Sequence, residues 1–204
     1  MTAGLVLAAG AGRRYGRPKA LVLRDGALLV ERAVATARSG GLDPVYVVLG
    51  AAADQVREQA RLGDAVLVEN PEWATGMGSS LRAGLAALAA TNAKAAAVLL
   101  VDMPGITPAA VARVAESAGP DTLRMGGYAD RRGHPVVLGR DHWAGVAETA
   151  TGDAGARAYL RAHAASVTVV PCDDVADDTD LDTPDGHDTP SAGTERLDRG
   201  PALE

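Results

Sequence analysis

Residues 7–19 read Leu7-Ala8-Ala9-Gly10-Ala11-Gly12-Arg13-Arg14-Tyr15-Gly16-Arg17-Pro18-Lys19, and this stretch decides the fold. The apolar run at residues 5–8 predicts a buried strand that ends in the glycine-rich loop. Glycines let backbone N–H groups approach an anion closely, while Arg14 and Lys19 add positive charge to the same loop. The loop is not a dinucleotide fingerprint, because its third glycine is misplaced, and it lacks the Gly-Lys-Ser/Thr of a Walker loop. The pattern predicts a cradle for a triphosphate, with an ordinary surface loop as the structural alternative.

Strands and helices alternate along the first half of the chain. Apolar runs predict strands at residues 5–8, 45–49, 65–68 and 95–101. Helical spacing predicts helices at residues 28–37, 54–62 and 79–90 and from Pro108 onward. Such alternation implies right-handed crossovers and an α/β fold with a mostly parallel central sheet. Ligands bind such a sheet at the carboxyl ends of its strands, where both the Gly10 loop and Asp102 fall.

The second half of the chain is less regular. It predicts a hairpin-like stretch at residues 122–138, helices near 141–149 and 154–163, and a strand at 167–170. Beyond Asp182 the composition shifts to Asp, Thr, Pro and Gly, which is typical of a flexible tail. We therefore expect one domain over residues 1–184 and a tail over 185–204.

The composition narrows the classes of partner. With 47% hydrophobic residues, 3% aromatic residues and no Phe, the core must consist of Ala, Val and Leu. The net charge of −6 argues against a nucleic-acid partner, which usually requires a basic face. No apolar run approaches the roughly 20 residues that span a bilayer, and no charged leader precedes the first strand, so we expect a cytoplasmic protein without membrane contact.

Asp102 follows the most hydrophobic predicted strand, in Val101-Asp102-Met103-Pro104. A carboxylate in that place is a hard oxygen ligand suited to Mg²⁺, which keeps several waters and bridges to substrate phosphates. The structural alternative is a turn or N-cap Asp before the helix at Pro108.

A Gly/Ser loop precedes the helix predicted at residues 79–90. It reads Asn70-Pro71-Glu72-Trp73-Ala74-Thr75-Gly76-Met77-Gly78-Ser79-Ser80-Leu81. Backbone N–H groups at a helix N-terminus and small hydroxyls could read the edge of a nucleobase, although an ordinary serine N-cap is the simpler explanation.

Taken together, these motifs resemble the MobA-like nucleotidyltransferases, whose signature L-A-A-G-x-G-x-R-M-G-x-P-K follows the first strand. Tyr15 replaces the usual Met, and every other signature position matches. The resemblance implies a three-layer, Rossmann-like nucleotidyltransferase fold in which Arg14 grips the β- and γ-phosphates and Lys19 stabilises charge at the α-phosphate. It implies that the nucleotide is bound by Leu7, Ala8, Ala9, Gly10, Gly12, Arg14, Lys19, Gly78, Ser79 and Ser80.

The resemblance also assigns a metal and a second ligand. Asp180-Leu181-Asp182-Thr183-Pro184 is similar to the family's D-I-D-T-P motif, so Asp102 and Asp182 are the expected Mg²⁺ ligands. Acidic neighbours allow the alternative of a merely solvated acidic segment. In this reading Arg14, Lys19 and Asp102 carry the catalysis.

Three segments resemble the subgroup that transfers CMP to the molybdenum cofactor. They are residues 70–80, Gly133-His134-Pro135-Val136 and Gly152-Asp153-Ala154-Gly155-Ala156-Arg157. The resemblance implies that His134, Pro135, Asp153 and Arg157 bind the acceptor, that Mg-CTP and molybdopterin are the substrates, and that a molybdenum hydroxylase receives the product. A sugar or polyol phosphate acceptor and a non-catalytic nucleotide-binding protein are the alternatives; the intact Arg14, Lys19 and Asp102 disfavour the second.

Overall fold

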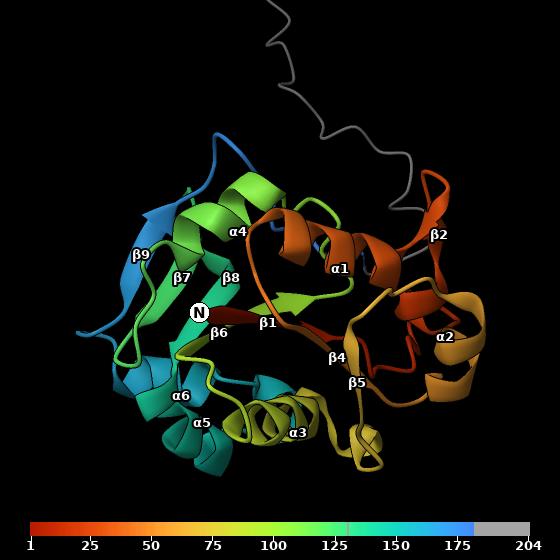
Figure 1. The fold of residues 1–204 in the computed structure, drawn as a ribbon, viewed down its shortest axis with the longest axis horizontal. Coiled ribbons are helices and arrows are strands. Elements are labelled where there is room, and N and C mark those ends of the chain that lie inside the picture. The colour runs from red at the N-terminus through yellow and green to blue at the C-terminus, as the bar shows by residue number, and fades with distance from the viewer. Residues whose placement is uncertain (130, 182–204) are drawn as a thin grey trace, which may run out of the picture.

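The computed structural model describes residues 1–129 and 131–181, which form a seven-stranded sheet between two layers of helices (Figure 1). The strand order is β5-β4-β1-β6-β8-β7-β9. In chain order the strands are β1 (Thr2–Leu7), β4 (Val45–Leu49), β5 (Val66–Glu69), β6 (Ala95–Leu100), β7 (Leu123–Tyr128), β8 (Arg131–Gly139) and β9 (Thr168–Pro171). Only β8 runs against the other strands of this sheet, because it pairs antiparallel with both β6 and β7. The mostly parallel α/β fold is therefore confirmed.

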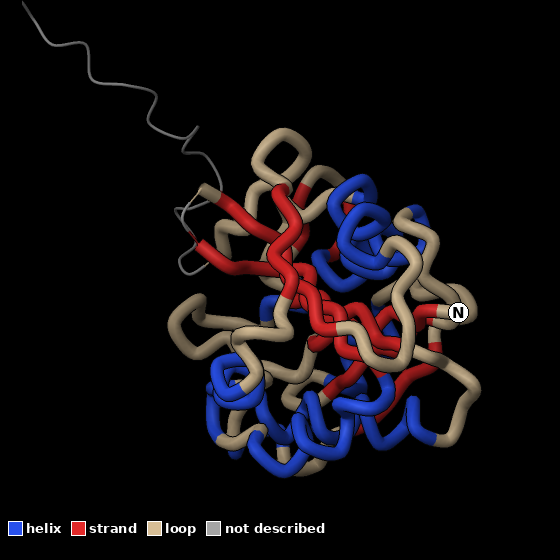
Figure 2. The backbone as a smooth tube through the Cα atoms, turned by 90° about the vertical axis from the view of Figure 1, so that its left-hand side faces the viewer, coloured by secondary structure: helices blue, strands red, loops and turns tan. Residues whose placement is uncertain are grey.

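Helices cover both faces of the sheet. The α-helices are α1 (Leu29–Ser39), α2 (Ala53–Gln59), α3 (Met77–Ala89), α4 (Pro108–Ala115), α5 (Trp143–Thr149) and α6 (Arg157–Ala162). Helices α1 and α4 lie on one face, whereas α3, α5 and α6 lie on the other (Figure 1). Figure 2, turned by 90°, shows the twisted sheet running between helices on its two sides.

The core has one hydrophobic cluster on each face of the sheet. Strand β1 contributes to both, since Val6 packs on the α1 side and Leu5 and Leu7 pack on the α3 side. A strand buried on both faces needs apolar residues at every position, which explains the continuous apolar runs in the sequence. The carboxyl ends of β1 and β6 are held together, because the Val101 N–H donates to the Leu7 carbonyl (3.3 Å).

The structure differs from the expected elements mainly in short segments. A hairpin of β2 (Leu23–Arg24) and β3 (Ala27–Leu28) was not expected, nor were the 3-10 turns η1 (Lys19–Leu21), η2 (Trp73–Thr75), η3 (Arg140–His142) and η4 (Gly152–Ala154). The helix expected near residue 154 begins only at Arg157, because Gly155 adopts a positive φ of 52°. The expected hairpin-like stretch is confirmed as the antiparallel pair β7–β8. The expected tail at residues 185–204 lies outside the described residues.

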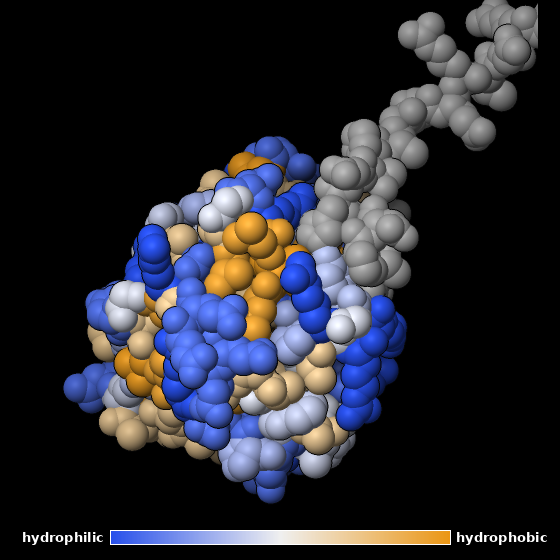
Figure 3. Space-filling model, turned by 90° about the vertical axis from the view of Figure 1, so that its right-hand side faces the viewer, coloured by the Kyte–Doolittle hydropathy of each residue, from blue (hydrophilic) through white to orange (hydrophobic). Residues whose placement is uncertain are grey.

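The surface is mixed in polarity. Figure 3 shows the side that carries β2, α2 and β5, where an apolar patch lies within a largely hydrophilic surface. Exposed large apolar side chains on these elements are Leu23, Val66 and Leu67. Within residues 1–129 and 131–181, no helix combines the length and the apolar character needed to cross a membrane.

Candidate active site

A cleft of about 540 Å³ opens at the carboxyl ends of β1 and β6. Five parts of the chain form its wall. They are residues 7 and 9–14 with Lys19, residues 73, 74, 76, 77 and 80, residues 100–102, residues 153 and 157, and Asp180. The cleft therefore brings the Gly10 loop and Asp102 together at the edge of the sheet where the sequence placed them.

The loop after β1 depends on glycine at one position. Gly12 has a φ of +62°, and a Cβ there would lie 1.9 Å from the carbonyl oxygen of Arg17. Tyr15 is buried in the core cluster on the α1 side, so the residue that departs from the family signature anchors the loop to the core. The Gly10 side of the loop faces open space, because a Cβ there would meet nothing within 4 Å. That opening leaves room for a ligand against the backbone.

Lys19 and Asp102 form an ion pair in the lining of the cleft. The Lys19 Nζ lies 2.9 Å from the Asp102 Oδ2, and the side chains are only 15% and 23% exposed. An ion pair shielded from water in this way interacts more strongly than one on the open surface. The two residues are 83 positions apart in the chain, so this contact is made by the fold alone.

The acidic segment after β9 packs on the loop that holds Asp102. The Leu181 N–H donates to the Asp102 carbonyl (2.9 Å), and the Asp177 N–H donates to the Gly105 carbonyl (3.1 Å). A Cβ at Gly105 would lie 2.4 Å from the Asp177 carbonyl oxygen, so glycine permits this close packing. The segment carries Asp180 to the wall of the cleft. Asp182, the expected second metal ligand, lies outside the described residues.

The donor set of the cleft fits a hard divalent cation. Asp102 and Asp180 both contribute carboxylates to its lining. Among the described residues, no group of three or more His, Cys, Asp or Glu side chains is arranged to hold a metal ion. Mg²⁺ usually takes only one or two carboxylates and completes its shell with waters and substrate phosphate oxygens, so two carboxylates beside a phosphate cradle suffice.

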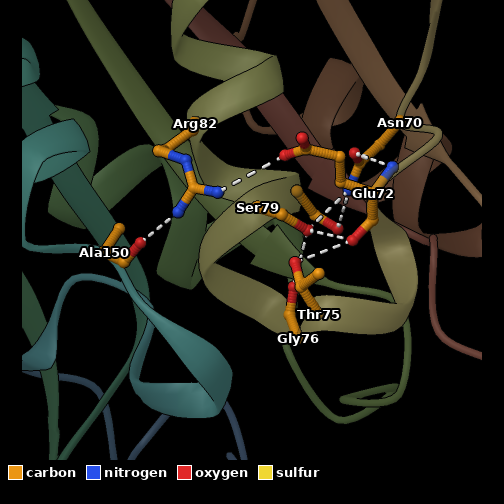
Figure 4. A network of polar contacts seen from close by, with 8 residues as sticks. Asn70, Glu72, Thr75, Gly76, Ser79, Arg82 and Ala150 are labelled. Carbon is orange, nitrogen blue, oxygen red and sulfur yellow. Dashed lines mark hydrogen bonds and ion pairs between the residues drawn. The ribbon is translucent and has the colours of Figure 1, made fainter.

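Asn70 organises the loop that leads into α3 (Figure 4). Its Nδ2 donates to Ser79 Oγ (2.8 Å) and to Ser80 Oγ (3.1 Å), and its Oδ1 accepts from the Glu72 N–H (3.0 Å). Asn70 and both serines are buried, and Ser80 forms part of the wall of the cleft. The loop is thus held by a buried polar network, and its Trp73 and Met77 also pack against the hydrophobic cluster on the α3 side.

The acceptor-side segments reach the cleft in part. Asp153 and Arg157, from η4 and α6, line it, and the Met77 N–H donates to Asp153 Oδ1 at 3.4 Å. His134 lies on β8 with its Nδ1 3.2 Å from the Val98 carbonyl oxygen. Burial lowers the pKa of His134, which keeps the ring neutral near pH 7.

Ten of the predicted site residues that the structure describes line the cleft, and five do not. Leu7, Ala9, Gly10, Gly12, Arg14, Lys19, Ser80, Asp102, Asp153 and Arg157 line it; Ala8, Gly78, Ser79, His134 and Pro135 are not part of its described wall. Ala8 and Pro135 are buried, Ser79 faces the Asn70 network, and Gly78 packs on the backbone of Ala150. The cleft also contains Arg13, Trp73, Met77 and Asp180, all of which stood in the quoted motifs but were not among the predicted site residues.

Comparisons with known proteins agree with this geometry. The MobA-like NTP transferase domain matches residues 4–173. A relative from Paenarthrobacter nicotinovorans, named nicotine blue oxidoreductase, is 42% identical over 188 residues and covers 88% of this chain and 91% of its own length. The molybdenum cofactor guanylyltransferase of Rhodobacter capsulatus is 32% identical over 142 residues, covering 69% of this chain and 65% of its own.

Solved structures show the same fold. The crystal structure of Rv0371c from Mycobacterium tuberculosis H37Rv has a TM-score of 0.77 at 30% identity and covers 90% of this chain and 93% of its own. A complex of Rv0371c with manganese has a TM-score of 0.70 at 29% identity, over 88% of this chain and 93% of its own. Because the domain match spans most of the chain and both sequence and structure agree with it, the protein is a nucleotidyltransferase of the MobA-like NTP transferase family.

Proposed function

We propose that the protein transfers CMP from Mg-CTP to the phosphate of molybdopterin and releases pyrophosphate. The contact that carries this proposal is the shielded Lys19–Asp102 pair at 2.9 Å, which lies beside the Gly10 loop in one cleft. It combines a cationic donor for a phosphate with a carboxylate for a metal, which are the two groups that phosphoryl-group chemistry needs.

The reaction needs few groups from the protein. A phosphate oxygen of the acceptor bonds to the α-phosphorus of the nucleotide as the bond from that phosphorus to the bridging oxygen breaks, and pyrophosphate leaves with the electron pair. A phosphate monoester is already ionised near neutral pH, so no general base is required. Arg14 binds the β- and γ-phosphates, and Lys19 stabilises the negative charge that grows on the α-phosphate.

Mg²⁺ would be held by Asp102 together with Asp180 or Asp182, and it supplies further positive charge at the reacting phosphate. Asp153 and Arg157, which also line the cleft, bind the acceptor, with the Arg157 guanidinium suited to its phosphate. His134 and Pro135 belong to β8, and the contact of His134 with the Val98 carbonyl oxygen ties this strand to β6 beside the acceptor residues.

The choice of CTP rests on the resemblance of residues 70–80 to the subgroup that transfers CMP. Ala9 lines the cleft, and its backbone is held in place because its carbonyl accepts from the Ala51 N–H (3.0 Å). After transfer, the cytidylylated cofactor would pass to a molybdenum hydroxylase.

The test is a comparison of donors and acceptors. The purified protein with Mg²⁺ is given each of the four nucleoside triphosphates with molybdopterin or with sugar and polyol phosphates, and pyrophosphate release and product mass are measured. The highest kcat/KM is expected for CTP with molybdopterin. A preference of tenfold or more for GTP, or for any sugar or polyol phosphate, contradicts the substrate assignment but not the family assignment.

A second candidate activity comes from the relative named nicotine blue oxidoreductase, whose 42% identity extends over 88% of the chain. The Gly10 loop could also hold the pyrophosphate of a reduced nicotinamide dinucleotide. Loss of the visible absorbance of nicotine blue in the presence of such a dinucleotide, with no pyrophosphate released from any nucleoside triphosphate, would favour this candidate.

A further inference from the structure

The orientation of the Asn70 amide is determined by a backbone group. Asn70 follows β5 and is 3% exposed. Its Oδ1 lies 3.0 Å from the Glu72 backbone nitrogen, which can only donate a hydrogen bond. The oxygen of the amide must therefore face Glu72, and its NH₂ group must face the first turn of α3.

This orientation makes both serine oxygens of that turn acceptors. The Asn70 Nδ2 donates to Ser79 Oγ at 2.8 Å and to Ser80 Oγ at 3.1 Å (Figure 4). Each hydroxyl must then direct its own proton to another acceptor. Ser79 has two, because the carbonyls of Gly76 and Glu72 lie 2.9 Å and 3.0 Å from its Oγ.

Ser80 differs from Ser79 at this point. Within the part of the chain that the structure describes, the Asn70 amide is the only hydrogen-bond partner of the Ser80 hydroxyl, and it is a donor. Ser80 is 4% exposed and forms part of the wall of the cleft. A shielded donor without an acceptor is unfavourable, and an acceptor atom on a bound ligand would satisfy it.

The surroundings of Ser80 indicate which part of a ligand supplies that atom. Its own segment contributes Trp73, Ala74 and Met77 to the wall, all of them uncharged. The cations of the cleft come from other segments, at Arg13, Arg14, Lys19 and Arg157. Phosphates belong beside those cations, whereas a neutral donor beside Trp and Met suits a flat heteroaromatic ring.

Ser80 is expected from the family resemblance to bind the nucleotide. We propose that buried Asn70 is the positioning residue that directs the Ser80 hydroxyl to a carbonyl oxygen or ring nitrogen of the nucleobase. The inference rests on the proposed function, since its ligand is the donor nucleotide. Asn70 touches no substrate and acts only through Ser80.

Two substitutions test the two halves of the inference. Ser80→Ala removes the donor. Asn70→Asp keeps the acceptor for the Glu72 N–H but replaces the NH₂ group by a second acceptor oxygen, which turns the serine hydroxyls toward itself and away from the cleft. Each change is expected to raise the dissociation constant of Mg-CTP by about three- to tenfold, and the double variant should be no worse than either single one.

The dissociation constants are measured by calorimetry on the full chain without an acceptor substrate, so that no turnover occurs. Thr75→Ala is the matched control. The Thr75 hydroxyl belongs to the same loop and donates to the Glu72 carbonyl (2.8 Å), but it does not line the cleft. This variant should bind Mg-CTP as tightly as the unaltered protein.

Ribose 5′-triphosphate, which carries no base, shows where the hydrogen bond goes. It is expected to bind equally well to the unaltered protein and to Ser80→Ala. An equal loss for CTP and for ribose 5′-triphosphate would place the contact on sugar or phosphate and overturn the inference. An unaltered protein that binds no nucleoside triphosphate would instead remove the proposed function itself.

The positioning role has its own refutation. Unchanged CTP affinity in Asn70→Asp, together with weakened binding in Ser80→Ala, shows that Ser80 acts without Asn70. Should Asn70→Asp not fold, Asn70→Ala takes its place. It frees the Ser80 hydroxyl to rotate, so CTP should bind at least about threefold more weakly, and unchanged affinity overturns the role.

Discussion

Replacing Lys19 by Met removes one positive charge from the centre of the cleft while keeping most of the length of the side chain. The Lys19 Nζ lies 2.9 Å from Asp102 Oδ2, and both side chains are largely shielded from water. Loss of one preorganised donor to a developing negative charge costs about 100- to 1,000-fold in kcat, which corresponds to about 2.7–4 kcal/mol. Turnover with Mg-CTP and molybdopterin should fall by that factor.

The same substitution should have the opposite effect on metal binding. In the unaltered protein without nucleotide, the Lys19 ammonium competes with a divalent cation for the Asp102 carboxylate. Lys19→Met removes this competitor, so Mn²⁺ should bind more tightly, as measured by electron paramagnetic resonance on the nucleotide-free protein. Lys94→Met is the control, because Lys94 is the only other lysine of the chain and is exposed. Turnover of Lys19→Met within threefold of the unaltered protein, with the fold intact, would refute the reasoning.

Four further outcomes follow from the structure. Asp102→Asn should abolish most metal-dependent turnover and weaken Mn²⁺ binding. Mn²⁺ titration of Asp180→Asn and of Asp182→Asn then identifies the second metal ligand, because only the loss of that ligand should weaken Mn²⁺ binding as Asp102→Asn does. Gly12→Ala should prevent stable folding of the loop, because the added Cβ would lie 1.9 Å from the Arg17 carbonyl oxygen. Gly10→Ala is the control, and its melting temperature should equal that of the unaltered protein, because the Cβ there would meet nothing within 4 Å. Gly133→Ala should cost about 2 kcal/mol in urea unfolding, since its Cβ would lie 2.1 Å from the Asp178 carboxylate that pairs with Arg131; unchanged stability contradicts this. Burial lowers the pKa of His134 below its value in the unfolded chain, so the unfolded state binds more protons in acid. The free energy of unfolding should therefore fall as the pH drops below about 6.5. His134→Gln should flatten this pH dependence, and an unchanged pH profile of unfolding in that variant argues against the role of His134.

Long apolar elements could be predicted from the sequence, whereas short ones could not. The continuous run at Val45–Leu49 gave a strand with the observed bounds, because a strand buried on both faces must be apolar throughout. Pro108 marked the start of α4, which Thr107 caps through a bond from the Ala110 N–H. The β2–β3 hairpin has only two residues in each strand, too few to show an alternating pattern. Its Asp25-Gly26 turn, with positive φ at both residues, was the one signal that could have revealed it.

Topology and motif resemblance together predicted much of the candidate site, since Ser80, Asp153 and Arg157 from the resembling segments also line the cleft. The carboxyl ends of parallel strands lie at one edge of the sheet, so the Gly10 loop and Asp102 were expected to lie together. The ion pair of Lys19 with Asp102 follows from this arrangement. Motif spacing does not say which way a side chain points, so the contact of His134 with the Val98 carbonyl oxygen could not be predicted, and its role at the acceptor stays a prediction.

Asn70 shows the remaining limit most clearly. It stood in a quoted motif, yet nothing in its neighbours along the chain indicates that its amide orders two serines nine and ten residues away. The orientation of the Asn70 amide is set by the backbone N–H of Glu72. The position of that N–H depends on the turn between β5 and α3 and on how α3 packs on the sheet. Because the direction of a hydroxyl proton depends on every partner around it, the donor at Ser80 becomes visible only when the whole network is seen in three dimensions.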